Sequence, residues 1–219
     1  MSDTLSGIVN TLKGIYQSHD NDTRRQFTLQ LEQLELNLQG EELVQIGISL
    51  LSGAADLAVL QAYGAVLLKK ALRIHGIRVH KLPFWELLRW YATDAGLNNL
   101  LCADLEELLL TCAFRLPDGE FSRLLDRLLA SNDLSQEPRR MRLIHGIVLK
   151  GVGPDLQWVP RARVGVLRGL LRERGPALLA AMNQTLFSIY STAGGAISPG
   201  SWRVRRISCW SGGWGFSRP

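Results

Sequence analysis

Residues Thr23 to Arg73 read TRRQFTLQLEQLELNLQGEELVQIGISLLSGAADLAVLQAYGAVLLKKALR. Apolar residues recur there at the three- to four-residue spacing of one helix face, and Gly40 and Gly53 divide the segment into three helices. Each apolar face is too broad for a lone helix, so each must be buried against a neighbour. The segment therefore predicts helices that stack side by side, with Leu67 among the buried positions.

The same pattern recurs along most of the chain at a regular interval. Grouped in pairs, the first helices are expected to start near residues 3, 41, 83 and 118, and the second helices near residues 23, 56, 98 and 137. This interval is closest to the period of about 40–47 residues in HEAT-type repeats. We expect an all-α fold, an α-solenoid of about four HEAT-like helix pairs over residues 1–189. A helical bundle would also give helices joined by short loops and is the alternative.

Special residues mark where the expected helices begin and end. Thr23, with Gln26 three residues later, forms a capping box, and Asp56 is the expected cap of the helix that ends at Arg73. A last helical segment is expected from Pro160 to Ile189. The expected interruptions are Gly40, the loop at residues 151–154, and a break at Gly175-Pro176.

Charge is distributed unevenly along this chain of formal net charge +5. Residues 1–120 carry 10 Lys/Arg and 15 Asp/Glu, whereas residues 121–189 carry 11 and 5. This asymmetry suits a scaffold that meets partners of different charge, and solvated helix faces produce similar counts.

The composition changes in residues 190–219, which contain six Gly, six Ser, three Trp and four Arg without any acidic residue. We expect a disordered tail outside the helical repeats. One interpretation is an aromatic and basic segment that contacts nucleic acid. The favoured interpretation is an end that does not belong to the repeat architecture.

The sequence offers no recognisable catalytic set, metal motif or cofactor motif, so we expect a binding protein that is not an enzyme and needs no cofactor. Cys102 and Cys112 lie ten residues apart on one expected helix, about 15 Å along its axis, which is too far for a disulfide. Reduced thiols are typical of cytosolic or nuclear proteins. No apolar run approaches the roughly 18 residues of a membrane span, so no membrane contact is expected.

Three features together resemble a known family. They are the capped helix with Arg24-Arg25 and its leucine stripe, the segment VLQAYGAVLLKKALRIHG at Val59–Gly76, and the leucine- and arginine-rich segment from Leu143 to Ile189. Their order resembles the N-terminal region of the importin-β/exportin (karyopherin) family of nuclear transport receptors, above all exportins that carry structured small RNAs. The chain departs from that pattern at His75-Gly76, near which the family has a tryptophan.

This resemblance implies binding of the GTPase Ran in its GTP form by the second helices of the pairs, and a contribution to nuclear export of RNA or protein cargo. It implies a protein of the nucleus and the cytoplasm. The residues that it suggests for the Ran contact are polar positions on those helices, namely Arg24, Arg25, Gln61, Lys69, Asp104 and Glu107.

Two further functions remain open on the sequence. One is a generic helical scaffold or adaptor without dependence on Ran. The other is an RNA-binding module, in which an arginine cluster contacts phosphates together with the tail. The candidate phosphate contacts are Arg139, Arg140, Arg142, Arg161 and Arg163, with Arg168 beside them.

Overall fold

The computed structural model describes residues 2–53, 58–94, 96–130, 137–153 and 159–192, and the statements below concern these residues. Their regular elements are all helical, which confirms the all-α expectation. The elements are α1 (Ser2–Gln17), α2 (Asn21–Leu36), α3 (Gly40–Gly53), α4 (Ala58–Arg73), the short 3₁₀ helix η1 (Val79–Lys81), α5 (Phe84–Thr93), α6 (Asn99–Ala113), α7 (Asp118–Leu129), α8 (Glu137–Val152) and α9 (Arg161–Thr192).

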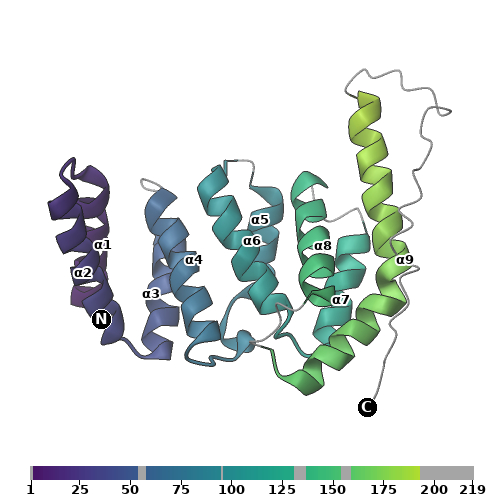
Figure 1. Cartoon of the computed structure of the whole chain (residues 1–219), viewed down its shortest axis with the longest axis horizontal. Coiled ribbons are helices and arrows are strands. Elements are labelled where there is room, and N and C mark those ends of the chain that lie inside the picture. The colour runs from purple at the N-terminus through teal and green to yellow at the C-terminus, as the bar shows by residue number, and fades with distance from the viewer. Residues whose placement is uncertain (1, 54–57, 95, 131–136, 154–158, 193–219) are drawn as a thin grey trace, which may run out of the picture.

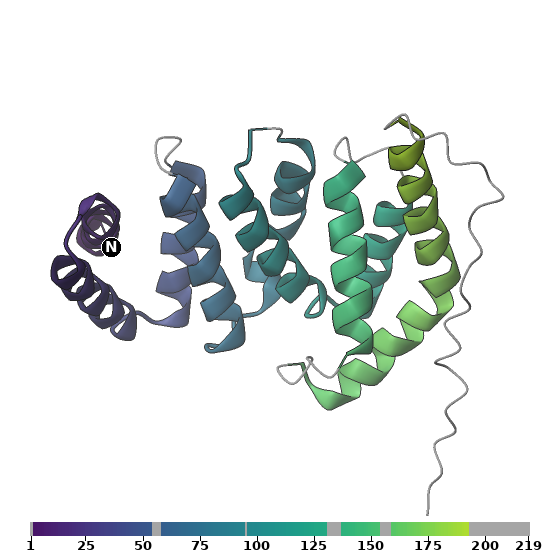
Figure 2. The same cartoon turned by 45° about the horizontal axis from the view of Figure 1, so that its top comes forward.

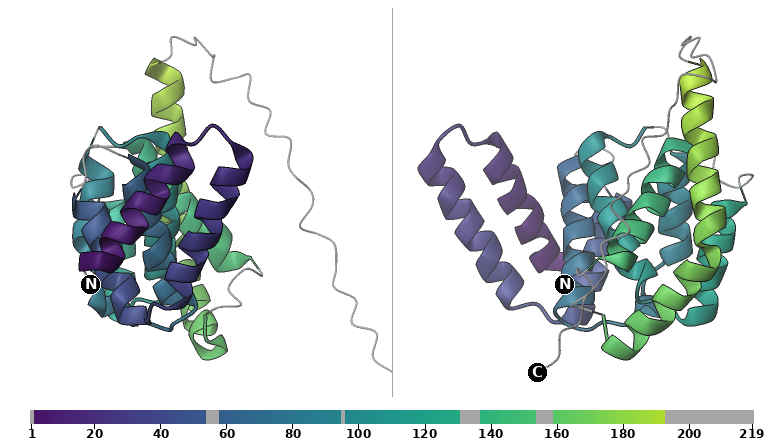
Figure 3. Two further views of the ribbon diagram at one scale, coloured as in Figure 1. Left: turned by 90° about the vertical axis from the view of Figure 1, so that its left-hand side faces the viewer. Right: turned by 45° about the vertical axis from the view of Figure 1, so that its right-hand side comes forward.

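The helices follow one another along the longest axis of the molecule (Figure 1). α1 packs on α2, α3 on α4 and α5 on α6, and the second helices α4, α6 and α8 also pack in sequence on one another. α9 packs on both α7 and α8 and covers that end of the array (Figure 3). We call α3, α5 and α7 the A helices and α2, α4, α6 and α8 the B helices. The arrangement is consistent with an α-solenoid-like fold, and the HEAT-like repeat remains a prediction.

Leucine side chains on the B helices form the centre of the core. Leu67 and Leu68 of α4 and Leu105 and Leu108 of α6 are fully buried. Burying one such side chain contributes about 1.5–3 kcal/mol. The core therefore runs continuously from α4 to α6, as the apolar stripe of the sequence predicts.

α3 and α4 approach each other closely because a glycine stands on each helix. A Cβ atom on Gly64 would lie 2.7 Å from the carbonyl oxygen of Gly47, and one on Gly47 would lie 3.0 Å from the carbonyl oxygen of Gly64. Two backbones can meet at this distance only where side chains are missing. The pair explains why glycines occur inside two helices that otherwise have strong apolar faces.

The N-terminal end of α2 differs from the expectation. Asp20 is its N-cap, and one carboxylate oxygen accepts hydrogen bonds from the Thr23 amide at 2.8 Å and the Thr23 hydroxyl at 2.6 Å. The predicted cap, Thr23, lies inside the first turn of the helix. The carboxylate of Asp20 already accepts the hydrogen bond of a free amide in that turn, so Asp20 is the cap. Gly40 does not end this helix either: α2 stops at Leu36, and Gly40 is the first residue of α3.

The C-terminal helices are longer than expected. Gly151 belongs to α8 and not to a loop, and α9 continues without a break through Gly175 and Pro176. Pro176 lacks the N–H that would bond to the carbonyl of Arg172, yet one missing bond kinks a helix more readily than it ends a long one. The ribbon of α9 does change direction along its length (Figure 1).

Other expectations have different outcomes. Cys102 and Cys112 are free and buried on α6, so the exclusion of a disulfide is confirmed. α9 extends to Thr192, two residues beyond the expected start of the tail. Asp56, Pro154 and the tail from residue 193 lie outside the described residues. No helix in the described ranges is long and apolar enough to cross a membrane.

Candidate functional site

Three of the residues suggested for partner binding meet between α4 and α6. Lys69 donates hydrogen bonds to Asp104 Oδ1 at 3.0 Å and to Glu107 Oε2 at 2.7 Å. The Lys69 side chain is only 11% exposed, so its charge is held by these two carboxylates. The structure thus brings Lys69, Asp104 and Glu107 together as one ion-paired group.

Arg73, one turn after Lys69, extends this group. Its Nη2 lies 3.1 Å from Glu107 Oε1 and 3.1 Å from Thr111 Oγ1. The hydrogen bond from Lys69, with attraction from Arg73, holds the pKa of Glu107 below its ordinary value. We call Lys69, Arg73, Asp104 and Glu107 the α4–α6 charge cluster. It fixes the position of two neighbouring B helices.

A second polar contact joins α2 to α4. The carboxylate of Glu35 accepts hydrogen bonds from the hydroxyl of Tyr63 and from the ammonium of Lys70. Together with the α4–α6 charge cluster, these bonds connect α2, α4 and α6 in one row. The B helices α2, α4 and α6 are therefore tied to one another by charged side chains.

A pocket of about 290 Å³, lined by both apolar and charged side chains, lies between the next two B helices, α6 and α8. Its lining includes the exposed Leu149, and Lys150 faces Glu107 across it closely enough to help lower the pKa of that carboxyl. A surface with exposed leucine rimmed by charge suits a protein partner. The remaining lining residues are Ala103, Glu106, Leu110, His145 and Gly146.

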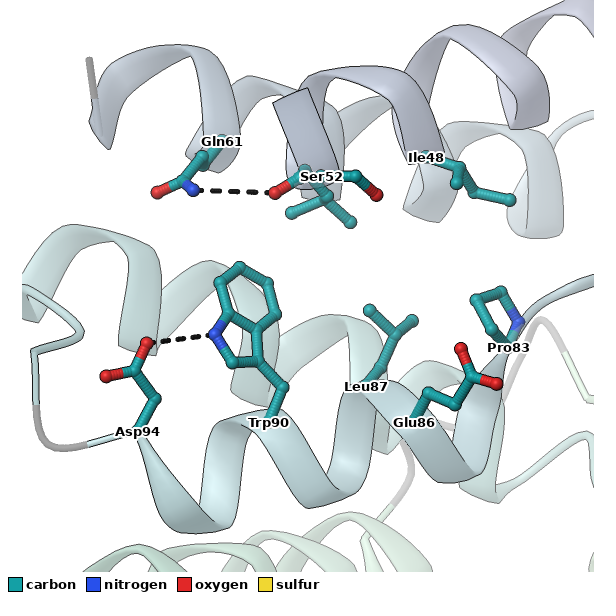
Figure 4. Close-up of a pocket in the computed structure, with 9 residues that line it drawn as sticks. Ile48, Ser52, Gln61, Pro83, Glu86, Leu87, Trp90 and Asp94 are labelled. Carbon is teal, nitrogen blue, oxygen red and sulfur yellow. Dashed lines mark hydrogen bonds between the residues drawn. The ribbon is translucent and has the colours of Figure 1, made fainter. Parts of the chain in front are cut away.

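The other suggested partner-binding residues do not join the cluster. Arg24 donates through Nε to the carbonyl of Ser18 at 2.8 Å, and Arg25 is exposed on α2. Gln61 lies at the α3–α5 side of the molecule, where its Nε2 is 3.4 Å from the carbonyl oxygen of Leu51 (Figure 4). Of the six residues suggested from the sequence, three therefore belong to the α4–α6 charge cluster and three lie apart from it.

The arginines suggested for phosphate contact serve mostly as caps of helix C-termini. Arg139 donates to the carbonyls of Tyr91 and Asp94 at the end of α5, and its guanidinium lies 5.7 Å from the centre of the Tyr91 ring. The buried Arg140 donates to the carbonyl of Leu128 at the end of α7, 3.1 Å away. Such bonds satisfy carbonyls that a helix leaves free at its last turn.

Two further arginines act in the same way. Arg163 donates to the carbonyl of Phe114 at the end of α6 and pairs with Asp118 at the start of α7. Arg168 lies 3.4 Å from the carbonyl of Gly151 in the last turn of α8. By contrast, Arg142 and Arg161 are exposed. The arginine cluster of the sequence is therefore divided between internal helix caps and a small exposed remainder.

Two buried side chains that could react, the Tyr91 phenol and the Cys112 thiol, are held in their neutral forms. Burial, with the nearby carboxylate of Glu106, raises the pKa of Tyr91, and burial raises the pKa of the Cys112 thiol. A neutral, fully enclosed thiol is a poor nucleophile. Within the described ranges, no group of three or more His, Cys, Asp and Glu side chains is placed to hold a metal ion.

Comparisons of the chain with family models, with curated proteins and with solved structures found no match.

Proposed function

We propose that this chain is a macromolecule-binding domain of a nuclear transport receptor of the importin-β/exportin (karyopherin) type, most like exportin-5. In this proposal the B helices bind Ran in its GTP form and contribute to nuclear export of an RNA or protein cargo, so the protein would act in both nucleus and cytoplasm. The proposal rests on the resemblance of the sequence. The structural observation that carries it is the continuous row of B helices, tied by the α4–α6 charge cluster.

The exposed members of this row are the proposed contacts. The side chain of Glu107 is 40% exposed although both of its carboxylate oxygens are bonded, so part of its surface is open to a partner. Arg142 and Leu149 are exposed on α8. Lys69 is too enclosed to meet a partner directly, and its part would be to hold α4 and α6 at a fixed spacing. Binding then needs little reordering, because the surface is formed in advance.

A pull-down with purified Ran tests this proposal. The full chain is immobilised and exposed to Ran loaded with a non-hydrolysable GTP analogue or with GDP. We expect selective capture of the GTP form, reduced at least tenfold by Arg142→Glu on the B row. Arg89→Glu, an exposed charge reversal on the A helix α5, is the matched control and should leave capture unchanged.

Equal capture of both forms, or none by a chain shown to be helical by circular dichroism, would overturn the Ran proposal. A generic protein-binding scaffold would then be the better description. The RNA-binding alternative now depends on Arg142 and Arg161, since Arg139, Arg140 and Arg163 already donate to backbone carbonyls. RNA affinity that falls steeply with salt and with Arg142→Glu plus Arg161→Glu would favour that alternative.

A further inference from the structure

A groove of about 450 Å³ separates the A helices α3 and α5 (Figure 4). α4 and α6 pack directly against each other on the B side, whereas α3 and α5 face each other across this space. The groove is therefore distinct from the B row proposed for Ran. Its lining residues are Ile48, Leu51, Ser52, Gln61, Pro83, Glu86, Leu87, Trp90 and Asp94.

The floor of the groove is apolar and anchored. Ile48 of α3 and Leu87 and Trp90 of α5 project into the space between the two helices (Figure 4). The indole Nε1 of Trp90 donates to Asp94 Oδ2 at 2.9 Å, which fixes the ring at the edge of the groove. A fixed, half-buried tryptophan is the kind of side chain that carries a large share of binding energy in protein interfaces.

The charge of the groove has one sign. Among the described residues, its lining includes two acidic residues, Glu86 and Asp94, and no Lys, Arg or His. Glu86 is exposed, and Asp94 lies at the end of the groove where α3 and α5 both terminate. The C-terminal end of α5 already has a cation, because Arg139 donates to the carbonyls of Tyr91 and Asp94 there. The carboxylate of Asp94 also accepts hydrogen bonds from Trp90 and from the amide of Gly96. Glu86, in the first turn of α5, is therefore the acid that is left exposed for a partner's cation.

We propose that this groove binds a short segment of a partner protein in which a bulky apolar side chain stands next to an arginine or lysine. The apolar side chain would pack on Trp90, Leu87 and Ile48, and the cation would pair with Glu86 at the exposed side. The acidic lining favours a basic partner because the charges are complementary. The apolar side chains of the groove favour a partner that also buries an apolar side chain there. The chain would then hold one partner on its A side independently of any partner on its B row.

Panning of a random twelve-residue peptide library on the full chain tests this proposal. The selected peptides are synthesised with a fluorophore, and their affinity is measured by fluorescence polarisation. We expect Arg or Lys beside Leu, Ile, Phe or Trp to be enriched among them. Glu86→Lys should weaken their binding at least tenfold, and Glu32→Lys, an exposed acid on α2, should not change it. Both positions are exposed, so neither variant should disturb the fold.

Three results would overturn the proposal. The first is a selected set without basic enrichment, and the second is binding that Glu86→Lys leaves unchanged. The third concerns the chain itself, because residues 199–214 contain tryptophans and arginines. If a peptide of that sequence binds the groove while library peptides bind only after residues 193–219 are removed, the occupant is the chain's own tail and not a partner. Trp90→Ala, checked for folding by circular dichroism, supplies a second variant that should abolish binding.

Discussion

Single residues decide how closely these helices approach. Gly64 and Gly47 leave no room for a side chain between α3 and α4, and the atom nearest to a Cβ on Gly64 is the backbone carbonyl oxygen of Gly47, which cannot rotate away. Gly169 on α9 has no atom within 4 Å of the position that a Cβ would occupy. The same substitution should therefore have opposite effects at the two positions.

We expect Gly64→Ala to lower the free energy of unfolding by about 1–3 kcal/mol, because the added methyl group would push α3 away from α4. Gly169→Ala is the control and should raise stability by about 0.5–1 kcal/mol, since alanine restricts the unfolded chain and favours helix. Urea unfolding followed by circular dichroism measures both. A Gly64→Ala chain as stable as the original would contradict the close contact.

Protonation of Glu107 is expected to weaken the fold. The hydrogen bond from Lys69 holds the pKa of Glu107 below its ordinary value of 4.5. A carboxyl whose pKa is lower in the folded chain than in the unfolded chain stabilises the fold above its unfolded pKa, and this contribution is lost as the pH falls through the folded pKa. Between about pH 6 and pH 3, the urea midpoint should fall more for the original chain than for Glu107→Gln. Equal falls would contradict the prediction.

At the scale of the element, the helices could be located from the sequence because their signal is local. Apolar spacing fixed α3, α4 and α6 to within a few residues, since each depends on its own stripe. Helix ends depend on more than apolar spacing: Asp20 and Thr23 are both good caps, and the geometry of the turn decides which one is used. The continuity of α9 through Pro176 was missed because packing against α7 and α8 compensates for the lost bond.

α6 provides a direct test of the assigned helix faces. Leu108 is fully buried and Leu100, two turns earlier on the same helix, is 52% exposed. We expect Leu108→Asp to lower the free energy of unfolding by several kcal/mol, because it buries a charge without a partner. Leu100→Asp should change the free energy of unfolding by no more than about 0.5 kcal/mol. Unfolding in urea compares them. Similar losses from both variants would mean that the face of α6 is assigned wrongly.

Arginine caps could not be predicted because they depend on which helix ends lie near each other in space. Arg139 joins α8 to the end of α5, and Arg142, one turn later, is exposed. Arg139→Ala should lower the free energy of unfolding by about 1–3 kcal/mol, since it leaves the carbonyls of Tyr91 and Asp94 without a donor. Arg142→Ala should have an effect within about 0.5 kcal/mol. Thermal unfolding that ranks the two in the reverse order would exclude the capping role.

At the scale of the whole molecule, several polar contacts between helices of different pairs join residues at similar sequence separations. Glu35 contacts Lys70, Lys69 contacts Asp104 and Trp85 contacts Glu120, in each case 35 positions apart in the sequence. The candidate site was chosen from single helix faces, so the sequence reasoning named Lys69, Asp104 and Glu107 without pairing them. Opposite charges about 35 positions apart on consecutive B helices are the sequence signal that indicates such a pairing. The groove between α3 and α5 had no such signal, because it arises from spacing between helices.

The α1–α2 pair should be the least stable part of the described array. It is tilted relative to α3 and α4 (Figure 2), and Glu35 supplies the polar bonds from α2 to α4 described above. In hydrogen exchange measured by mass spectrometry, we expect amides of α1 and α2 to exchange faster than those of α4 and α6. Glu35→Ala should increase the amide exchange rates of α1 and α2 further and leave the exchange rates of α6 unchanged. Uniform protection along the chain would contradict this view.

The short sequence separation of these contacts also bears on how the protein is made. The side-chain bonds named above between helices of different pairs join residues no more than 49 positions apart. A helix pair that leaves the ribosome therefore finds its partner already synthesised, directly before it in the chain. Domains with mostly local contacts fold quickly, and nascent chains can fold from the N-terminus onward. The array can grow during translation one pair at a time, with each new B helix exposing its leucines only until it packs on the one before.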